Sequence, residues 1–123
     1  TQFFDGTGLH GENVSTPGEL TKMVQAAYRY ADIRAFSTTP EYSVMVRGQE
    51  QRFRNTNALV KKPEWEIDIS KTGFINEAGR CLVMMAHIQD KPVVIVLMDS
   101  WGKYTRIGDA NRVKDWLDVA ARN

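Results

Sequence analysis

The stretch EWEIDISKTGFINEAGRCLVMMAHIQDKPVVIVLMD, residues 64–99, decides the predicted fold. Its first part alternates apolar with polar residues, and Trp65, Ile67 and Ile69 hold the apolar positions. A period of two is typical of a strand that buries one face. We therefore expect a strand that buries these three side chains together and continues to Phe74.

Two nearly continuous apolar runs follow, at residues 80–88 and 92–99, after a predicted turn at residues 76–79. Only residues 89–91 separate the two runs. Such a short connection makes neighbouring strands antiparallel, and the loss of alternation indicates that both faces of the sheet are covered. The predicted fold class is α/β, in the α+β sense: an antiparallel sheet with helices on its faces.

Helices are predicted on either side of these strands in the sequence. Residues 17–31 carry a helical apolar spacing, with Thr16 as the N-cap and Glu19 placed as in a capping box. A second short turn is expected at residues 33–36, and an amphipathic helix at residues 109–121. The last helix can cover one face of the sheet, so the other face is expected to lack cover from within this chain.

The remaining segments are expected at the surface. Residues 1–15 are rich in Gly, Asn, Ser and Thr and are predicted to form a loop. Two short polar strands are predicted at residues 42–46 and 51–54.

The composition excludes several classes of protein. Its 42% hydrophobic and 25% charged residues match an ordinary globular domain. A net charge of +1 gives no strong field toward nucleic acid or an anionic membrane. The longest apolar run, residues 92–98, is far shorter than the roughly 20 residues of a membrane-spanning helix, so no span is predicted. Cys81 is the only cysteine, which excludes an internal disulfide and a cysteine-based metal cluster.

Several other polar residues are expected to be structural. His10 lies in a Gly-rich loop, and His87 lies in an apolar strand without a second His or a carboxylate at ligand spacing. Cys81 is predicted to be a buried small hydrophobe. The acidic side chains of the first strand are expected to form its solvated side, namely Glu64, Glu66 and Asp68.

A nucleic-acid interface is an alternative that the sequence leaves open. Basic residues interleaved with aromatic ones can bind phosphates and stack on bases. The near-zero net charge argues against this reading of Arg47, Arg52, Arg54, Lys61, Lys62, Phe53 and Trp65.

The residues Lys71, Thr72 and Gly73 form the candidate binding site. A Lys ammonium attracts an anionic ligand end, a Thr hydroxyl gives a directional hydrogen bond, and Gly lets a ligand backbone approach closely. Together they fit the carboxylate end of an extended peptide that pairs with the strand. The plain alternative is a solvated strand end.

The segments TGLHGENVST, FRNTNALV and KTGFINEAGRCLVMMAHIQDKPVVIVLMDSWGKYTRIGDANRVKDWL resemble the C-terminal half of the serine-type D-alanyl-D-alanine peptidases, the low-molecular-weight penicillin-binding proteins. The resemblance covers nearly the whole chain and is greatest for the D-alanyl-D-alanine endopeptidase branch. It implies the penicillin-recognising, β-lactamase-like fold, peptidoglycan peptides and β-lactams as ligands, a location in the bacterial periplasm, and no metal or organic cofactor. It also implies that Lys71 and Thr72 bind the terminal carboxylate and that the backbone N–H of Phe74 donates to the oxyanion hole.

The sequence departs from this family in one respect. The family mechanism needs a Ser-x-x-Lys motif at a helix N-terminus and a Ser-x-Asn motif on the opposite wall. No Ser-x-Asn occurs here, and the only Ser-x-x-Lys, from Ser100 to Lys103, follows an apolar strand and is interpreted as coincidental. Residues 1–123 are therefore expected to be the C-terminal portion of one transpeptidase-like domain, inactive alone, whose nucleophile lies on an N-terminal portion absent from this chain. The rival hypothesis is a non-catalytic module that binds peptides or partner proteins.

Overall fold

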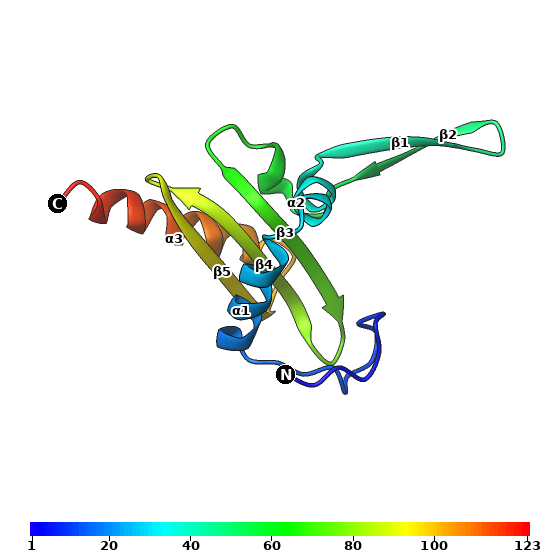
Figure 1. Cartoon of the computed structure of the whole chain (residues 1–123), viewed down its shortest axis with the longest axis horizontal. Helices are drawn as coiled ribbons and strands as arrows, with labels where there is room; N and C mark the ends of the chain where they lie inside the picture. Colours follow the sequence, from blue (N-terminus) through cyan, green and yellow to red (C-terminus); the bar gives the residue numbers. More distant parts are fainter.

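The structure is a computed structural model that describes residues 1–123 (Figure 1). A helical pair and a hairpin precede a sheet, and one long helix follows it. In chain order the elements are α1 (Pro17–Ala27), α2 (Ala31–Thr38), β1 (Glu41–Val46), β2 (Gln49–Arg54), the 3-10 helix η1 (Ala58–Lys61), β3 (Glu66–Ile75), β4 (Gly79–Ile88), β5 (Lys91–Ser100) and α3 (Thr105–Ala120).

The central sheet has the order β3-β4-β5, and both neighbouring pairs are antiparallel. The predicted antiparallel sheet is therefore confirmed. The turn between β4 and β5 places Gln89 and Asp90 at φ of 53° and 60°. Two successive positive φ values are typical of a tight hairpin turn whose twist matches that of the strands. The short connection in the sequence thus fixes the pairing of β4 with β5.

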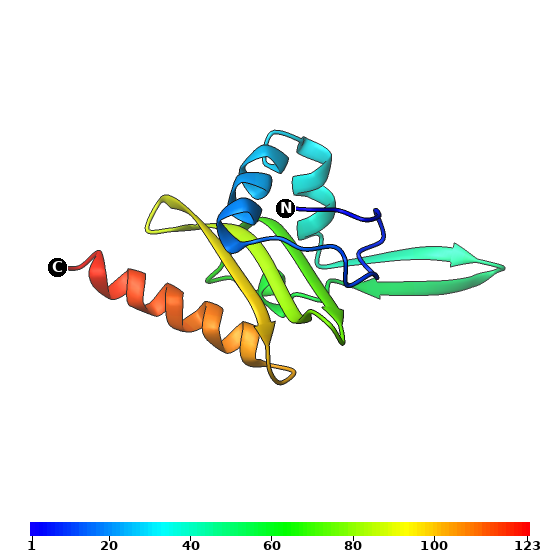
Figure 2. The same cartoon turned by 90° about the horizontal axis from the view of Figure 1, so that it is seen from below.

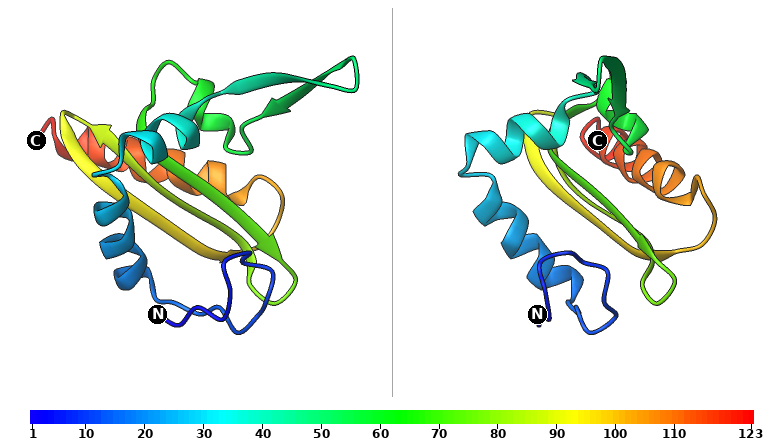
Figure 3. Two further views of the ribbon diagram at one scale, coloured as in Figure 1. Left: turned by 45° about the vertical axis from the view of Figure 1, so that its right-hand side comes forward. Right: turned by 90° about the vertical axis from the view of Figure 1, so that its right-hand side faces the viewer.

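Helices cover both faces of this sheet, as Figure 2 and the right-hand view of Figure 3 show. The face under α3 carries the larger cluster of buried residues, here called the α3-side core. The opposite face carries the α1-side core, formed by Val24 of α1 with Ile69 and Met85. The expectation that the second face lacks cover from this chain is therefore wrong. The α3-side core consists of Leu59, Trp65, Leu82, Met84, Ala86, Ile88, Ile95 and Ala110.

The alternating residues at the start of β3 do not share one face. Trp65 belongs to the α3-side core and Ile67 packs against it, whereas Ile69 belongs to the α1-side core. The register of β3 on β4 shifts between Ile67 and Ile69, which marks a β-bulge at Asp68. One extra residue reverses the face of every side chain that follows. The predicted strand is confirmed, but the prediction of a single buried face is wrong.

The helix boundaries also differ from those predicted. The helix expected over residues 17–31 ends at Ala27, and α2 begins at Ala31, because the chain turns between them. Thr16 caps α1 as predicted, its hydroxyl accepting from the Glu19 N–H at 3.2 Å. The Glu19 carboxylate also pairs with the N-terminal amine of Thr1. The last helix begins at Thr105, four residues before the predicted start at residue 109.

The strands β1 and β2 pair only with each other and form an arm that extends away from the central sheet (Figures 1 and 3). Their prediction as two surface strands is confirmed, although β2 begins two residues earlier than expected. No helix in the structure combines the length and apolar character needed to cross a membrane.

Candidate functional site

Lys71, Thr72 and Gly73 lie in β3, which forms one edge of the central sheet. They follow the bulge, and Lys71 faces Val83 of β4 in the register. An edge strand presents backbone N–H and C=O groups that no neighbouring strand uses. The three residues therefore lie where an added peptide strand can pair with the sheet.

A cavity of about 510 Å³ borders this edge. Three parts of the chain that are far apart in the sequence line it: α2, the end of β2 with the loop after it, and β3. Its walls carry charges of both signs beside an apolar side chain, Phe36, that is 78% exposed. The lining residues are Asp32, Ile33, Phe36, Ser37, Arg54, Asn55, Thr56, Ser70, Lys71 and Thr72.

The Lys71 ammonium carries an unpaired positive charge on the wall of this cavity. Its Nζ donates to the backbone carbonyl of Thr72, and no carboxylate lies within ion-pair distance of it. Lys71 is exposed, so its charge is available to a ligand. The arrangement supplies one uncompensated cation beside a free strand edge.

The loop before β3 connects the elements around the site through hydrogen bonds. Asn55 holds the end of α2, since its side-chain amide donates to the carbonyls of Ser37 at 2.9 Å and Thr39 at 3.1 Å. The hydroxyl of Thr56 is hydrogen-bonded to that of Thr72. The loop therefore joins the two walls of the cavity.

Asn57 anchors the same loop inside the molecule. It is 1% exposed, and its amide nitrogen donates to the Ser70 hydroxyl at 2.9 Å. Its side-chain oxygen caps η1 by accepting from the Leu59 N–H at 3.1 Å. The sequence analysis assigned no role to this residue, because nothing in the sequence shows which polar side chains are buried.

Gly73 has no steric need to be glycine within this chain. A Cβ built on it meets no atom within 4 Å. The open space beside the strand leaves room for a ligand backbone. Phe74 follows with its ring half-exposed and packed under the Arg80 guanidinium, whose carbon lies 4.5 Å from the ring centroid. The oxyanion role of the Phe74 N–H stays a prediction.

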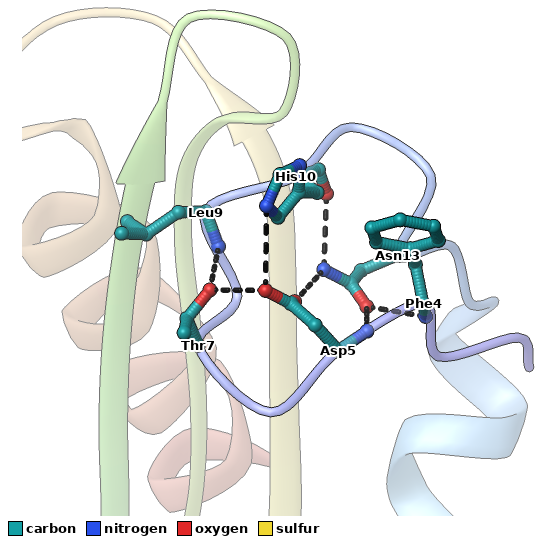
Figure 4. A network of polar contacts seen from close by, with 6 residues as sticks. All are labelled: Phe4, Asp5, Thr7, Leu9, His10 and Asn13. Atoms are coloured by element: carbon teal, nitrogen blue, oxygen red, sulfur yellow. Dashed lines mark hydrogen bonds and ion pairs between the residues drawn. The ribbon is translucent and has the colours of Figure 1, made fainter.

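His10 belongs to a polar network inside the N-terminal loop (Figure 4). Its Nε2 lies 3.5 Å from the Asp5 carboxylate, and the Asn13 side chain accepts from the Phe4 N–H at 2.8 Å. Hydrogen bonds from Thr7 and then Asn13 hold the pKa of Asp5 below its ordinary value. This network folds the loop onto itself, which supports the structural role expected for His10.

His87 and Asp68 do not match their predicted environments. Nδ1 of His87 lies 2.8 Å from Oδ2 of Asp68, so His87 has a carboxylate neighbour and Asp68 is not part of a solvated face. The two are nineteen positions apart in the sequence and meet only because β4 folds back on β3. Cys81 is only partly buried, whereas it was predicted to be a buried small hydrophobe.

The candidate nucleic-acid patch does not assemble. Trp65 is buried in the α3-side core, and its Nε1 donates to Asn111 of α3 at 3.0 Å. Arg52 and Arg54 share the Glu41 carboxylate at 3.1 and 3.6 Å. A buried ring cannot stack on bases, so Trp65 cannot serve in a nucleic-acid interface.

The segment from Ser100 to Lys103 is not helical. β5 ends at Ser100, α3 begins only at Thr105, and Trp101 between them is 91% exposed. The structure thus agrees with the interpretation of this Ser-x-x-Lys as coincidental.

Arg106, in the first turn of α3, was not among the predicted site residues. Its guanidinium donates to the Cys81 carbonyl at 2.9 Å, and Cys81 lies opposite Gly73 in the register. This contact fixes the start of α3 behind the candidate site. Only the folded chain brings these residues together, so the sequence pattern held no signal for it.

Comparisons with known proteins agree with this arrangement. A Streptomyces DD-transpeptidase of known crystal structure superimposes with a TM-score of 0.73 and 29% identity, over 87% of this chain and 43% of that one. The chain is 44% identical to a D-alanyl-D-alanine endopeptidase of Pseudomonas aeruginosa and 45% identical to one of Escherichia coli. Both matches cover 97% of this chain and 39% of the relative, so the chain spans about two fifths of their length. The family model described as D-alanyl-D-alanine carboxypeptidase matches residues 1–102, and the chain therefore belongs to that family.

Proposed function

We propose that the full-length protein carrying this chain is a serine-type D-alanyl-D-alanine endopeptidase or carboxypeptidase of the bacterial periplasm. It cleaves D-alanyl bonds in peptidoglycan through a serine acyl-enzyme, and β-lactams form the same kind of adduct. Residues 1–123 are the C-terminal portion of its catalytic domain, and the nucleophile lies on the N-terminal portion. The two relatives at 44% and 45% identity favour cleavage of cross-links, since both are described as endopeptidases.

The observation that carries this proposal is the uncompensated Lys71 ammonium beside the cavity. A peptide that ends in a carboxylate brings one negative charge, and two unit charges about 4 Å apart attract by roughly 1 to 4 kcal/mol near a protein surface. Thr72 adds a hydroxyl to this cation, and Gly73 leaves space for the ligand backbone. Lys71 and Thr72 therefore orient the substrate by its carboxylate.

The free edge of β3 supplies the second part of the binding mode. A substrate in extended conformation pairs with the edge as an added strand and is held by backbone hydrogen bonds. This pairing fixes the distance between the carboxylate at Lys71 and the scissile bond. The backbone N–H of Phe74, three residues further along the strand, is the proposed oxyanion donor.

The test is acylation of the full-length protein by a fluorescent penicillin. We expect Lys71→Ala to lower the second-order acylation rate by about tenfold to a hundredfold, because a charge-assisted hydrogen bond contributes roughly 1.5 to 3 kcal/mol. The matched control is Lys91→Ala, which removes an exposed Lys at the other end of the sheet.

An equal rate for wild type and Lys71→Ala would contradict the proposed role of Lys71. Complete absence of acylation in the wild-type full-length protein, combined with retained peptide binding, would favour the non-catalytic module instead. Equal losses in Lys71→Ala and Lys91→Ala would point to a general effect of charge.

A further inference from the structure

The bulge in β3 decides which face of the sheet Lys71 occupies. In the register, Ile67 faces Ala86 and Ile69 faces Met85, so Asp68 is the added residue. Ile67 packs on the α3-side core and Ile69 on the α1-side core, which shows the reversal directly. A single residue inserted into a strand turns all later side chains to the opposite face.

Lys71 follows Ile69 by two positions and therefore shares its face. Its partner on β4, Val83, packs against the α1-side core. α2, which lines the cavity, lies on this side of the sheet with α1 (Figure 2), and the cavity follows the edge of β3, where Ser70 and Thr72 also border it. In a regular strand, Lys71 would share the face of Ile67, under α3, and would point away from α2.

A side-chain contact across the two strands holds the bulge in place. Oδ2 of Asp68 lies 2.8 Å from Nδ1 of His87, a residue of β4. Both atoms are buried and neither makes a hydrogen bond, so the two side chains meet at ion-pair distance only. If the bulge moved along β3, the carboxylate and the imidazole would separate, and this close approach of two buried polar atoms would be lost.

We infer that Asp68 and His87 are positioning residues for Lys71. Their contact fixes the bulge before Ile69, and the position of the bulge puts the Lys71 side chain on the face of the sheet that carries α1 and α2. The contact does not touch the ligand and acts only through the register of the strand. This inference rests on the proposed function, since it assigns Lys71 to ligand binding.

The test is penicillin acylation of the full-length protein in the variants Asp68→Ala and His87→Ala. We expect each to acylate at least about tenfold more slowly than wild type, because a misplaced binding group is costly to the reaction. The double variant should be no slower than either single variant, since both remove the same contact. Asp68→Asn should restore most of the rate, because it keeps a side-chain oxygen of the same reach beside the His87 ring.

The control for stability is Ile95→Val, which removes a methylene from the α3-side core without touching the bulge. It lowers the melting temperature by leaving a small void in that core, and we expect it to leave the acylation rate unchanged. A role for Asp68 limited to stability would slow acylation in Ile95→Val and Asp68→Ala alike when their melting temperatures are similar. That result would overturn the inference.

A second measurement does not depend on acylation. In the full-length protein, NMR should show side-chain contacts between Lys71 and Val83 in wild type and in Asp68→Asn, and lose them in Asp68→Ala. If these contacts persist in Asp68→Ala, the inference is wrong. If Lys71→Ala acylates like wild type while the contacts are lost as expected, the proposed function fails and the bulge assignment stands.

Discussion

Two glycines near the site have opposite steric environments. Gly79 has a φ of +66°, and a Cβ on it would collide with the Asp99 side chain and lie 3.0 Å from the Asp99 Cα. Gly73 has open space where its Cβ would be. The fold therefore requires glycine at position 79, whereas at position 73 only a ligand would require it.

We expect Gly79→Ala to lower the stability of the full-length protein by about 1 to 3 kcal/mol, because a non-glycine residue at this φ is strained. Gly73→Ala should melt like wild type and yet cleave peptide on the order of tenfold to a hundredfold more slowly, because its methyl group displaces the substrate strand. Thermal unfolding and peptide turnover measure the two effects separately. A drop in melting temperature for Gly73→Ala, without loss of turnover, would contradict this assignment.

Asn57 provides a second prediction at the residue scale. Asn57→Ala leaves the buried Ser70 hydroxyl and the Leu59 N–H without their partner. Each unsatisfied buried group costs about 1 to 3 kcal/mol, so we expect a clear decrease in the free energy of unfolding. Denaturant unfolding measures it, with Asn76→Ala in the exposed β3–β4 turn as the control. Equal stability of the two variants would show that the Asn57 contacts are replaced by water.

The elements show which features of the fold were predictable. The pairing of β4 with β5 followed from the length of their connection, and the capped start of α1 followed from Thr16 and Pro17. The bulge at Asp68 was not predictable, because an added residue leaves no mark in the alternation of Ile67 and Ile69. The break after α1 was missed for a similar reason, since the apolar spacing continues past it to residue 31.

The last turns of α3 yield a prediction about pH. The Lys114 ammonium lies 2.7 Å from one oxygen of Asp118, and the Gln89 amide donates to the other at 2.8 Å. These two contacts, Lys114 first, hold the pKa of Asp118 below its ordinary value. A lowered pKa stabilises the folded state above the ordinary pKa of about 3.9, and this stabilisation is lost as the pH falls through the lowered value.

We expect Lys114→Met to raise the pKa of Asp118 toward its ordinary value, as measured by carboxyl NMR titration. Lys103→Met, which removes an equal charge far from Asp118 in the sequence, serves as the control. The attachment of α3 to the β4–β5 turn should also weaken at a higher pH in Lys114→Met than in wild type. An unchanged Asp118 titration in Lys114→Met would show that the Lys114 contact does not set the pKa.

At the scale of the whole molecule, one wall of the candidate site could be predicted from the sequence and the opposite wall could not. Lys71, Thr72 and Gly73 were predicted as a site because their side-chain chemistry is specific and their neighbours form a patterned strand. The opposite wall, with Asp32 and Arg54, comes from other elements and depends on how α2 and the arm dock against β3. Sequence spacing carries no information on such docking.

The final prediction concerns where the acyl group forms. Ser100 is the only Ser of this chain in a Ser-x-x-Lys pattern, and it ends a strand, so Lys103 is not held one helical turn away as a base. We therefore expect the isolated 123-residue chain to gain no β-lactam mass. The full-length protein should gain one adduct, and proteolysis with mass spectrometry should locate it outside residues 1–123. As a control, Ser100→Ala in the full-length protein should acylate at the wild-type rate. An adduct on Ser100 would contradict both the assignment of the nucleophile and the proposed division of the catalytic domain.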